Sequence, residues 1–182
     1  DDSRMQAYHD NEWGKKVTDD KIWFEFLVLD SFQAGLSWKI VLHKREGFKK
    51  AFCNFEVRKV AALKEDYLLK LKEDTSIIRN KLKIKATVSN AQAFIKIQEE
   101  YGSFNNYIWK LVGEKNIHNH FNKMQDVPAK TDLSDKLSKN LISRGFKFVG
   151  STICYAFMQA AGIVNDHTTD CFRHQEILKE EL

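Results

Sequence analysis

Few residues in this 182-residue chain interrupt regular structure. The sequence has a single proline, Pro128, and only eight glycines, and these are the residue types that most strongly break helices. It also has no stretch of alternating apolar and polar residues long enough to indicate a sheet. The sequence therefore predicts an all-α fold, which we expect to form a single unit over residues 1–182.

Cysteine is also scarce. The three cysteines, Cys53, Cys154 and Cys171, are an odd number in a chain of this length, which argues against a disulfide framework and favours a reducing compartment. The first residues are polar and are followed by no apolar segment of the kind that a secretory signal needs. We therefore expect a cytoplasmic protein.

Long hydrophobic runs and a strong net charge are missing as well. The longest run without charge covers residues 148–165, which is at the lower limit for a membrane span. Because this run includes glycine, serine, threonine and glutamine, it predicts a buried core helix, and we expect no membrane association. The net charge is +4, from 29 basic and 25 acidic residues, which permits nucleic-acid binding without requiring it.

Apolar residues recur at intervals of three and four through most of the chain, as expected for amphipathic helices. A first helix follows the N-cap candidates Thr18, Asp19 and Asp20 and extends through Asp30. Further helices are predicted over residues 39–52, 56–63, 65–71, 79–100, 104–112, 132–144 and 149–162. Residues 113–130 are the most polar stretch and predict a long loop.

The last two predicted helices form a candidate DNA-binding element over about residues 133–162. Gly145 can adopt a positive φ, and Gly150 lets the next helix begin close to another backbone. The free N–H groups at that helix start would attract a phosphate, and Arg144 and Lys147 would add positive charge. This is the pattern of a helix-hairpin-helix motif, although many helical proteins join helices by a glycine turn without binding DNA.

Two segments near the N-terminus, residues 8–14 and 30–38, combine aromatic and polar side chains. Asp30 follows the apolar run Phe26-Leu-Val-Leu29, where an unpaired carboxylate would be costly. It therefore binds either a ligand or nearby backbone amides, and the sequence leaves both open. With Tyr8 and Trp38, Asp30 would suit a flat, polar, cationic ligand.

His167 and Cys171 are four residues apart and would lie on one face of a helix. Such a pair supplies half of a tetrahedral zinc site, and His9 is a candidate third ligand. The spacing also occurs by chance, so a role in packing stays open. Cys53 and Cys154 lie on apolar faces and predict buried thiols. The other histidines are expected at the solvated surface: His43, His118, His120 and His174.

Together these segments resemble the DNA-3-methyladenine glycosylase I family of the helix-hairpin-helix DNA glycosylase superfamily. The resemblance extends from about residue 5 to 172, in the family's order and spacing. The matching segments are Tyr8-His-Asp-Asn-Glu-Trp-Gly14, Gln33-Ala-Gly-Leu-Ser-Trp38, Ile77-Ile-Arg79, Leu82-Lys-Ile84, Gly145-Phe-Lys-Phe-Val-Gly-Ser-Thr-Ile-Cys-Tyr155 and Val164-Asn-Asp-His167.

The resemblance implies a role for several of these residues. His9, His167 and Cys171 would be three of four ligands of a structural Zn²⁺ that joins the chain ends. The family's fourth ligand, a cysteine, is expected upstream of Asp1. Asp30 would be the catalytic residue, at a position where the family carries glutamate. Tyr8, Trp38 and Trp13 would contact the base, while the DNA contacts would come from Gly35, Leu36, Gly145, Lys147 and Gly150.

The resemblance also implies an activity. The chain is expected to be a monofunctional base-excision repair enzyme that hydrolyses the N-glycosidic bond of 3-methyladenine in alkylated DNA. Its partner would be double-stranded DNA, its pocket would lie between two helical subdomains, and it would be a monomer. One alternative is a catalytically impaired helix-hairpin-helix protein that binds DNA or senses lesions. A zinc-stabilised helical scaffold without a DNA role is another, but it leaves the hairpin glycines unexplained.

Overall fold

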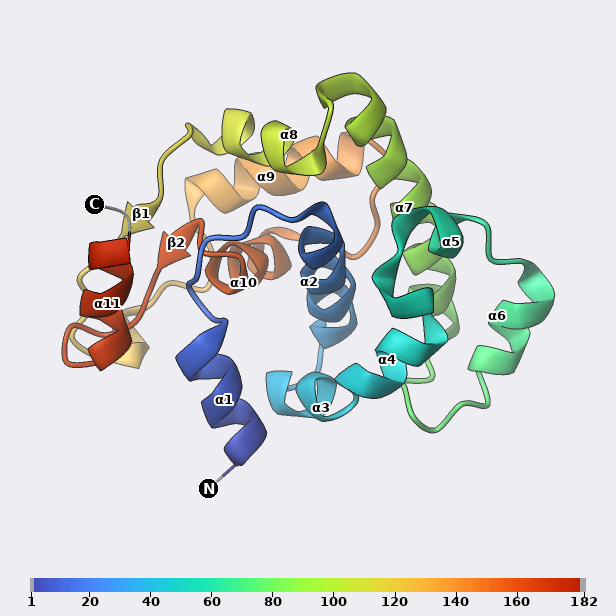
Figure 1. Cartoon of the computed structure of the whole chain (residues 1–182), viewed down its shortest axis with the longest axis horizontal. Helices are drawn as coiled ribbons and strands as arrows, with labels where there is room; N and C mark the ends of the chain where they lie inside the picture. The colour runs from blue at the N-terminus through green and yellow to red at the C-terminus, as the bar shows by residue number, and fades with distance from the viewer. Residues whose placement is uncertain (1, 181–182) are drawn as a thin grey trace.

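A computed structural model of the chain describes residues 2–180 and is mostly helical (Figure 1). The predicted helical fold class is therefore confirmed, while the division into two subdomains stays a prediction. The α-helices are α1 (Ser3–Asn11), α2 (Asp20–Gln33), α3 (Trp38–His43), α4 (Arg45–Ala51), α5 (Val57–Ala61), α6 (Glu65–Leu71), α7 (Lys81–Tyr101), α8 (Phe104–Val112), α9 (Asp132–Ser143), α10 (Ser151–Ala160) and α11 (Phe172–Glu180). Two 3₁₀ helices, η1 (Cys53–Phe55) and η2 (Met124–Asp126), and two short strands, β1 (Ile117–His118) and β2 (Val164–Asn165), complete it.

Short polar side chains fix where several helices begin. The carboxylate of Asp19 accepts from the backbone N–H of Lys21 at the start of α2, and Asn80 caps α7 in the same way. Thr131 and Ser134 form a reciprocal capping box at the start of α9. These caps satisfy N–H groups that have no partner within the helix, so the boundaries follow from local sequence.

Helix α2 is the centre of the fold. Every residue from Trp23 to Phe32 is buried, because α3, α7, α8 and α10 all pack against this helix. Figure 1 shows α2 and α10 next to each other in the middle of the molecule, with α1 and α3 near one end of the pair. A helix covered on all sides is apolar around its whole circumference, which makes the buried carboxylate of Asp30 within it unusual.

Several local predictions were wrong. Residues 39–52 form two helices, α3 and α4, that meet at Lys44. The predicted loop 113–130 contains η2 and also β1, which pairs in parallel with β2; a two-residue strand is too short to give an alternating pattern. His174 is buried rather than solvated, and its Nε2 lies 2.9 Å from the backbone oxygen of Asn119.

The uncharged run behaves as predicted. Most of it forms α10, whose side chains Cys154, Phe157 and Met158 are buried in the core. Among residues 2–180, no helix combines the length and the apolar character needed to cross a membrane. The prediction of a buried thiol at Cys53 was wrong: this residue is only partly buried, because it lies in the turn of η1 instead of on a regular helix face.

Candidate functional site

A pocket of about 280 Å³ opens beside α2, at the small end of the range for ligand pockets. Residues from α1, α2, α3, η2 and α10 line it, so segments that are far apart in the sequence meet here. The pocket therefore brings together the two aromatic and polar segments that the sequence singled out. The lining residues are Met5, Tyr8, His9, Trp13, Asp30, Gln33, Trp38, Met124, Ala156 and Gln159.

The carboxyl group of Asp30 is the most unusual group in this pocket. The residue is 2% exposed, and its Oδ2 has no hydrogen-bond partner among the described residues. Burial raises the pKa of Asp30 well above its ordinary value of 3.8, because a buried carboxylate loses its hydration. Since a polar atom without a partner is costly inside a protein, the geometry favours Asp30 as a ligand-binding group.

Two aromatic rings provide the flat walls of the pocket. The ring centroids of Tyr8 and Trp38 lie 5.0 Å apart at an interplanar angle of 46°. The indole Nε1 of Trp38 is buried and, like Oδ2 of Asp30, has no partner in the described part of the chain. The pocket thus combines ring faces with an unsatisfied donor and an unsatisfied acceptor, which suits a planar ring with polar edges.

Sequence reasoning missed five of the lining residues. Gln33 could have been predicted, because it lies about one helical turn after Asp30 and therefore on the same side of α2. Gln159 is the one amide on the apolar helix α10 and, with Ala156 one turn before it, was also detectable. Met5 and Met124 gave no local signal. Met124 lies on η2 within the long loop, and the path of this loop brings it to the same pocket as residues of α1 and α10.

The predicted DNA-contacting loop follows directly after α2. Gly35 has a φ of +80°, a conformation that favours glycine, and Leu36 is 40% exposed. The backbone N–H of Leu36 donates to the carbonyl of Gln33 at 2.6 Å, which keeps the turn tight. An apolar side chain is thereby presented to solvent next to the pocket.

In the segment predicted to form a helix-hairpin-helix motif, α9 and α10 pack against each other and are joined by residues 144–150; a DNA-binding role of this segment stays a prediction. Gly145 has a φ of +94°, whereas Gly150 has an ordinary φ of −62° and is the N-cap of α10. The expected close approach of another backbone at Gly150 was wrong, because beyond its chain neighbours no described atom lies within 4 Å of the position that a Cβ would take. No side chain within residues 2–180 caps α10, so its first N–H groups stay available for an anion. Lys147 is exposed beside them.

Arg144, which was expected to add positive charge to the hairpin, is already engaged. Its guanidinium binds both carboxylate oxygens of Glu100, at 2.6 and 3.2 Å, and donates to the hydroxyl of Tyr101 at 2.8 Å. It also lies about 5 Å from the ring centres of Tyr101 and Tyr107. Arg144 therefore anchors the end of α9 to α7 and α8 instead of facing a phosphate.

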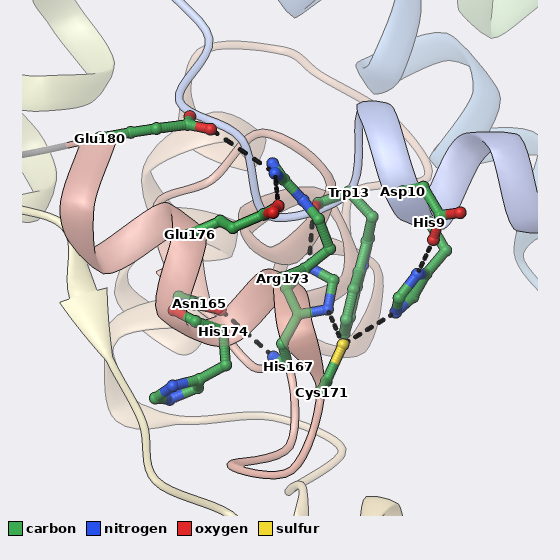
Figure 2. Close-up of polar contacts among 10 residues, drawn as sticks. All are labelled: His9, Asp10, Trp13, Asn165, His167, Cys171, Arg173, His174, Glu176 and Glu180. Atoms are coloured by element: carbon green, nitrogen blue, oxygen red, sulfur yellow. Dashed lines mark hydrogen bonds and ion pairs between the residues drawn. The ribbon is translucent and has the colours of Figure 1, made fainter.

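The three predicted metal ligands, His9, His167 and Cys171, lie close together (Figure 2), and His9 also lines the pocket. The Sγ atom of Cys171 lies 3.6 Å from Nε2 of His9 and 3.5 Å from Nδ1 of His167. A tetrahedral zinc ion with ordinary Zn–S and Zn–N bonds would separate such atoms by about 3.6 Å. The two Sγ–N distances therefore fit a zinc site, and the three candidate ligand atoms all lie within 4.8 Å of one another.

The other nitrogen of each histidine ring is held by a hydrogen-bond partner. Nδ1 of His9 lies 2.7 Å from Oδ1 of Asp10, and Nε2 of His167 lies 3.0 Å from the carbonyl oxygen of Trp13 (Figure 2). These acceptors place the proton on the outer nitrogen and leave the lone pair of the inner nitrogen facing Cys171. Burial lowers the pKa of His167 to about 4, so this ring is neutral at neutral pH.

A helical fold with a small aromatic and acidic pocket beside two packed helices is the arrangement that the sequence resemblance implies for a DNA glycosylase. A family model described as methyladenine glycosylase matches residues 1–174. DNA-3-methyladenine glycosylase 1 of Escherichia coli is 46% identical over 165 residues, which cover 91% of this chain and 88% of that protein.

Solved structures agree with the sequence comparison. A crystal structure of 3-methyladenine DNA glycosylase I superposes with a TM-score of 0.91 at 44% identity and covers 94% of both chains. A variant of 3-methyladenine DNA glycosylase I in complex with 3-methyladenine gives a TM-score of 0.91 at 35% identity, covering 94% of this chain and 92% of that one. The chain belongs to the methyladenine glycosylase family.

Proposed function

We propose that this protein is a DNA glycosylase that removes 3-methyladenine from alkylated DNA by hydrolysing its N-glycosidic bond. The observation that carries the proposal is the buried carboxyl group of Asp30, whose Oδ2 lacks a partner among the described residues in a pocket walled by Tyr8 and Trp38. A relative with the same fold was solved in complex with 3-methyladenine, which is a planar ring of the kind that these walls suit.

The charge of the substrate explains why one carboxyl group suffices. Methylation at N3 makes the adenine of the nucleotide formally cationic, so the bond between C1′ and N9 breaks with the electron pair going to the base, which leaves neutral. The sugar is left as an oxocarbenium-like ion that water captures, as in glycoside hydrolysis generally. No side chain has to protonate the leaving group, and we expect no lyase step.

Asp30 would discriminate the cationic base from ordinary adenine. Burial raises the pKa of Asp30 and so favours its neutral form, whereas a cationic ring next to it would favour the carboxylate again. Stacking on Tyr8 and Trp38 would add roughly 1–3 kcal/mol per aromatic contact. This offsets part of the few kcal/mol needed to extrude a nucleotide, a cost that is lowest for a damaged base.

The length of Asp30 has a consequence for this contact. The resemblance implies a glutamate at this position in the family, and one methylene less would withdraw the carboxyl group by about 1.5 Å, one carbon–carbon bond length. A bridging water would then connect Asp30 to the edge of the base.

Double-stranded DNA is the proposed partner. The free N–H groups at the start of α10 would bind a backbone phosphate, with Lys147 adding charge. The exposed Leu36 would enter the space that the extruded nucleotide leaves. We further propose that the protein acts as a monomer, with the pocket between two helical subdomains.

The cluster of His9, His167 and Cys171 would hold a structural Zn²⁺. Its support is the match between the Sγ–N distances and tetrahedral geometry, together with the two histidines oriented by outer acceptors. When bound, the ion would join α1 to the segment before α11 and supply no chemistry to the base. The fourth ligand expected upstream of Asp1 lies outside the described residues.

The experiment is to incubate the protein with methylated duplex DNA and to identify released bases by chromatography, for the wild type and for Asp30→Asn. Release of free 3-methyladenine by the wild type, with a large loss in the variant, supports the proposal. DNA binding without release of any base would instead support the alternative of a lesion-sensing protein.

A further inference from the structure

Helix α7 carries three polar side chains on its buried face. Lys83, Thr87 and Asn90 are 6%, 3% and 2% exposed, and intervals of four and three residues place them on one side of the helix. Burying such groups is costly unless each finds a partner. The partners they find therefore show what this face of α7 holds in place.

Lys83 holds the end of α2. Its ammonium group donates to the carbonyl oxygens of Phe32 at 2.8 Å and Ala34 at 2.6 Å. These are among the last carbonyls of the helix, where the backbone has no internal partner and the helix dipole favours a cation. The loop that contains Gly35 and Leu36 begins at Ala34, one of the two residues whose carbonyl oxygens Lys83 binds.

Asn90 holds the connection between α9 and α10. Its side-chain amide donates to the backbone carbonyl of Lys147 at 3.0 Å, and its Oδ1 accepts from the backbone N–H of Lys147 at 2.8 Å. The ammonium group of Lys83 also lies 5.8 Å from the centre of the Phe148 ring. Figure 1 shows α7 beside α2 and this connection.

Lys83 and Asn90 are seven residues apart and therefore about 10 Å apart along the helix. Helix α7 thus holds the loop after α2 at one point and, at another, the connection of residues 144–150 that leads to the proposed phosphate site. Thr87 lies between them, and its hydroxyl donates to the carbonyl of Lys83 at 2.9 Å. Both held segments are ones that the proposed function brings into contact with DNA.

We infer that Lys83 is a positioning residue that, together with Asn90, fixes the loop of residues 34–37 relative to the α9–α10 turn, so that Leu36 enters the duplex at a set distance from the bound phosphate. This inference rests on the proposed function. It predicts that loosening either contact impairs extrusion of the nucleotide and leaves the base pocket itself intact.

The test compares Lys83→Met and Asn90→Ala with Lys85→Met, a control on the exposed side of α7 where the lysine pairs with Glu65. Three quantities are measured: the single-turnover rate of base release from methylated duplex DNA, the affinity for a duplex containing an abasic-site analogue, and the affinity for free 3-methyladenine. Thermal melting establishes that each variant is folded. If Lys83→Met is unfolded, Lys83→Gln replaces it, because the glutamine amide keeps a donor.

Lys83→Met and Asn90→Ala should each slow release at least about tenfold, since an error of 1 Å in positioning can cost about a hundredfold. Affinity for the abasic duplex should fall as well, while affinity for free 3-methyladenine stays within about twofold, or 0.4 kcal/mol. Release and duplex affinity that match those of Lys85→Met would overturn the inference, and so would an equal loss of free-base affinity. A wild-type protein that releases no base would contradict the proposed function itself.

Discussion

The buried position of Asp30 disfavours the ionised form of its carboxyl group. No partner among the described residues offsets the loss of hydration, so burial raises its pKa, and the protein carries this group at a cost in stability. Because the folded form binds the proton more tightly than the unfolded chain, stability falls as the pH rises from 3.8 through the raised pKa. A carboxyl group kept under such conditions indicates that binding, and not folding, explains its presence.

Asp30→Asn tests both sides of this argument. The amide cannot ionise, so at neutral pH we expect a higher melting temperature than in the wild type. Because the variant cannot present a carboxylate to the cationic base, release of 3-methyladenine should fall by about 100-fold or more, a loss typical of removing a principal electrostatic contact. Calorimetry and single-turnover assays measure the two effects. Full retention of excision would show that Asp30 does not have the assigned role.

At the scale of elements, helix ends were more predictable than pocket walls. Caps such as Asn80 and Thr131 and the glycine turn at Gly145 act through neighbouring residues, so sequence alone predicts α7, α9 and α10 closely. Met124 and the pairing of β1 with β2 depend on contacts between distant segments, which leave no periodic signal. The unusual character of Asp30 was predictable, because a carboxylate in an apolar run is costly to bury without a partner.

Gly145 and Gly150 should respond differently to alanine. Gly145→Ala places a Cβ at a φ of +94°, so the free energy of unfolding should fall by about 1 kcal/mol. Gly150 has an ordinary φ, and beyond its chain neighbours no described atom lies within 4 Å of the position that a Cβ would take, so Gly150→Ala should fold normally. Its methyl group would stand beside the free N–H groups of α10 and weaken duplex affinity. Denaturant unfolding and DNA titration measure these effects, and unchanged duplex affinity in folded Gly150→Ala would contradict the phosphate site.

Arg45, the first residue of α4, connects this helix to two other elements. It donates to Glu25 on α2 and to Glu12 at the end of α1, both at 2.7 Å. Since Glu25 is 7% exposed, Arg45→Met leaves a buried carboxylate unpaired and should lower the free energy of unfolding by about 3 kcal/mol. Lys49→Met, which breaks an exposed pair with Glu46, should cost about 1 kcal/mol or less. Urea denaturation distinguishes the two, and equal losses would contradict a structural role for Arg45.

For the whole molecule, the proposed zinc site of His9, His167 and Cys171 would hold α1 in place beside the pocket. Helix α1 supplies Met5, Tyr8 and His9 to the pocket wall, and His9 is also within 3.6 Å of Cys171, more than 160 residues away in the chain. Sequence spacing indicated the pair of His167 and Cys171. His9 was only a candidate third ligand on its residue type, and the resemblance to a family assigned it to the same site, because nothing local links the two segments.

Removal of zinc should therefore lower the stability of the folded protein, since the proposed ion takes no direct part in cleavage of the N-glycosidic bond. We expect about one zinc per chain by elemental analysis, and a strong chelator should lower the melting temperature. His167→Ala should abolish binding, whereas His120→Ala, at an exposed histidine, should leave it unchanged. A protein that contains no zinc, and whose melting temperature is unaffected by the chelator, would contradict the proposed site.

The central claim is that the pocket of Asp30, Tyr8 and Trp38 selects and releases one alkylated base. The most direct measurement follows 3-methyladenine and 7-methylguanine released from the same methylated duplex DNA by the wild-type protein. We predict release of 3-methyladenine with 7-methylguanine left in the DNA. Release of both bases at similar rates, or of neither, would contradict the account.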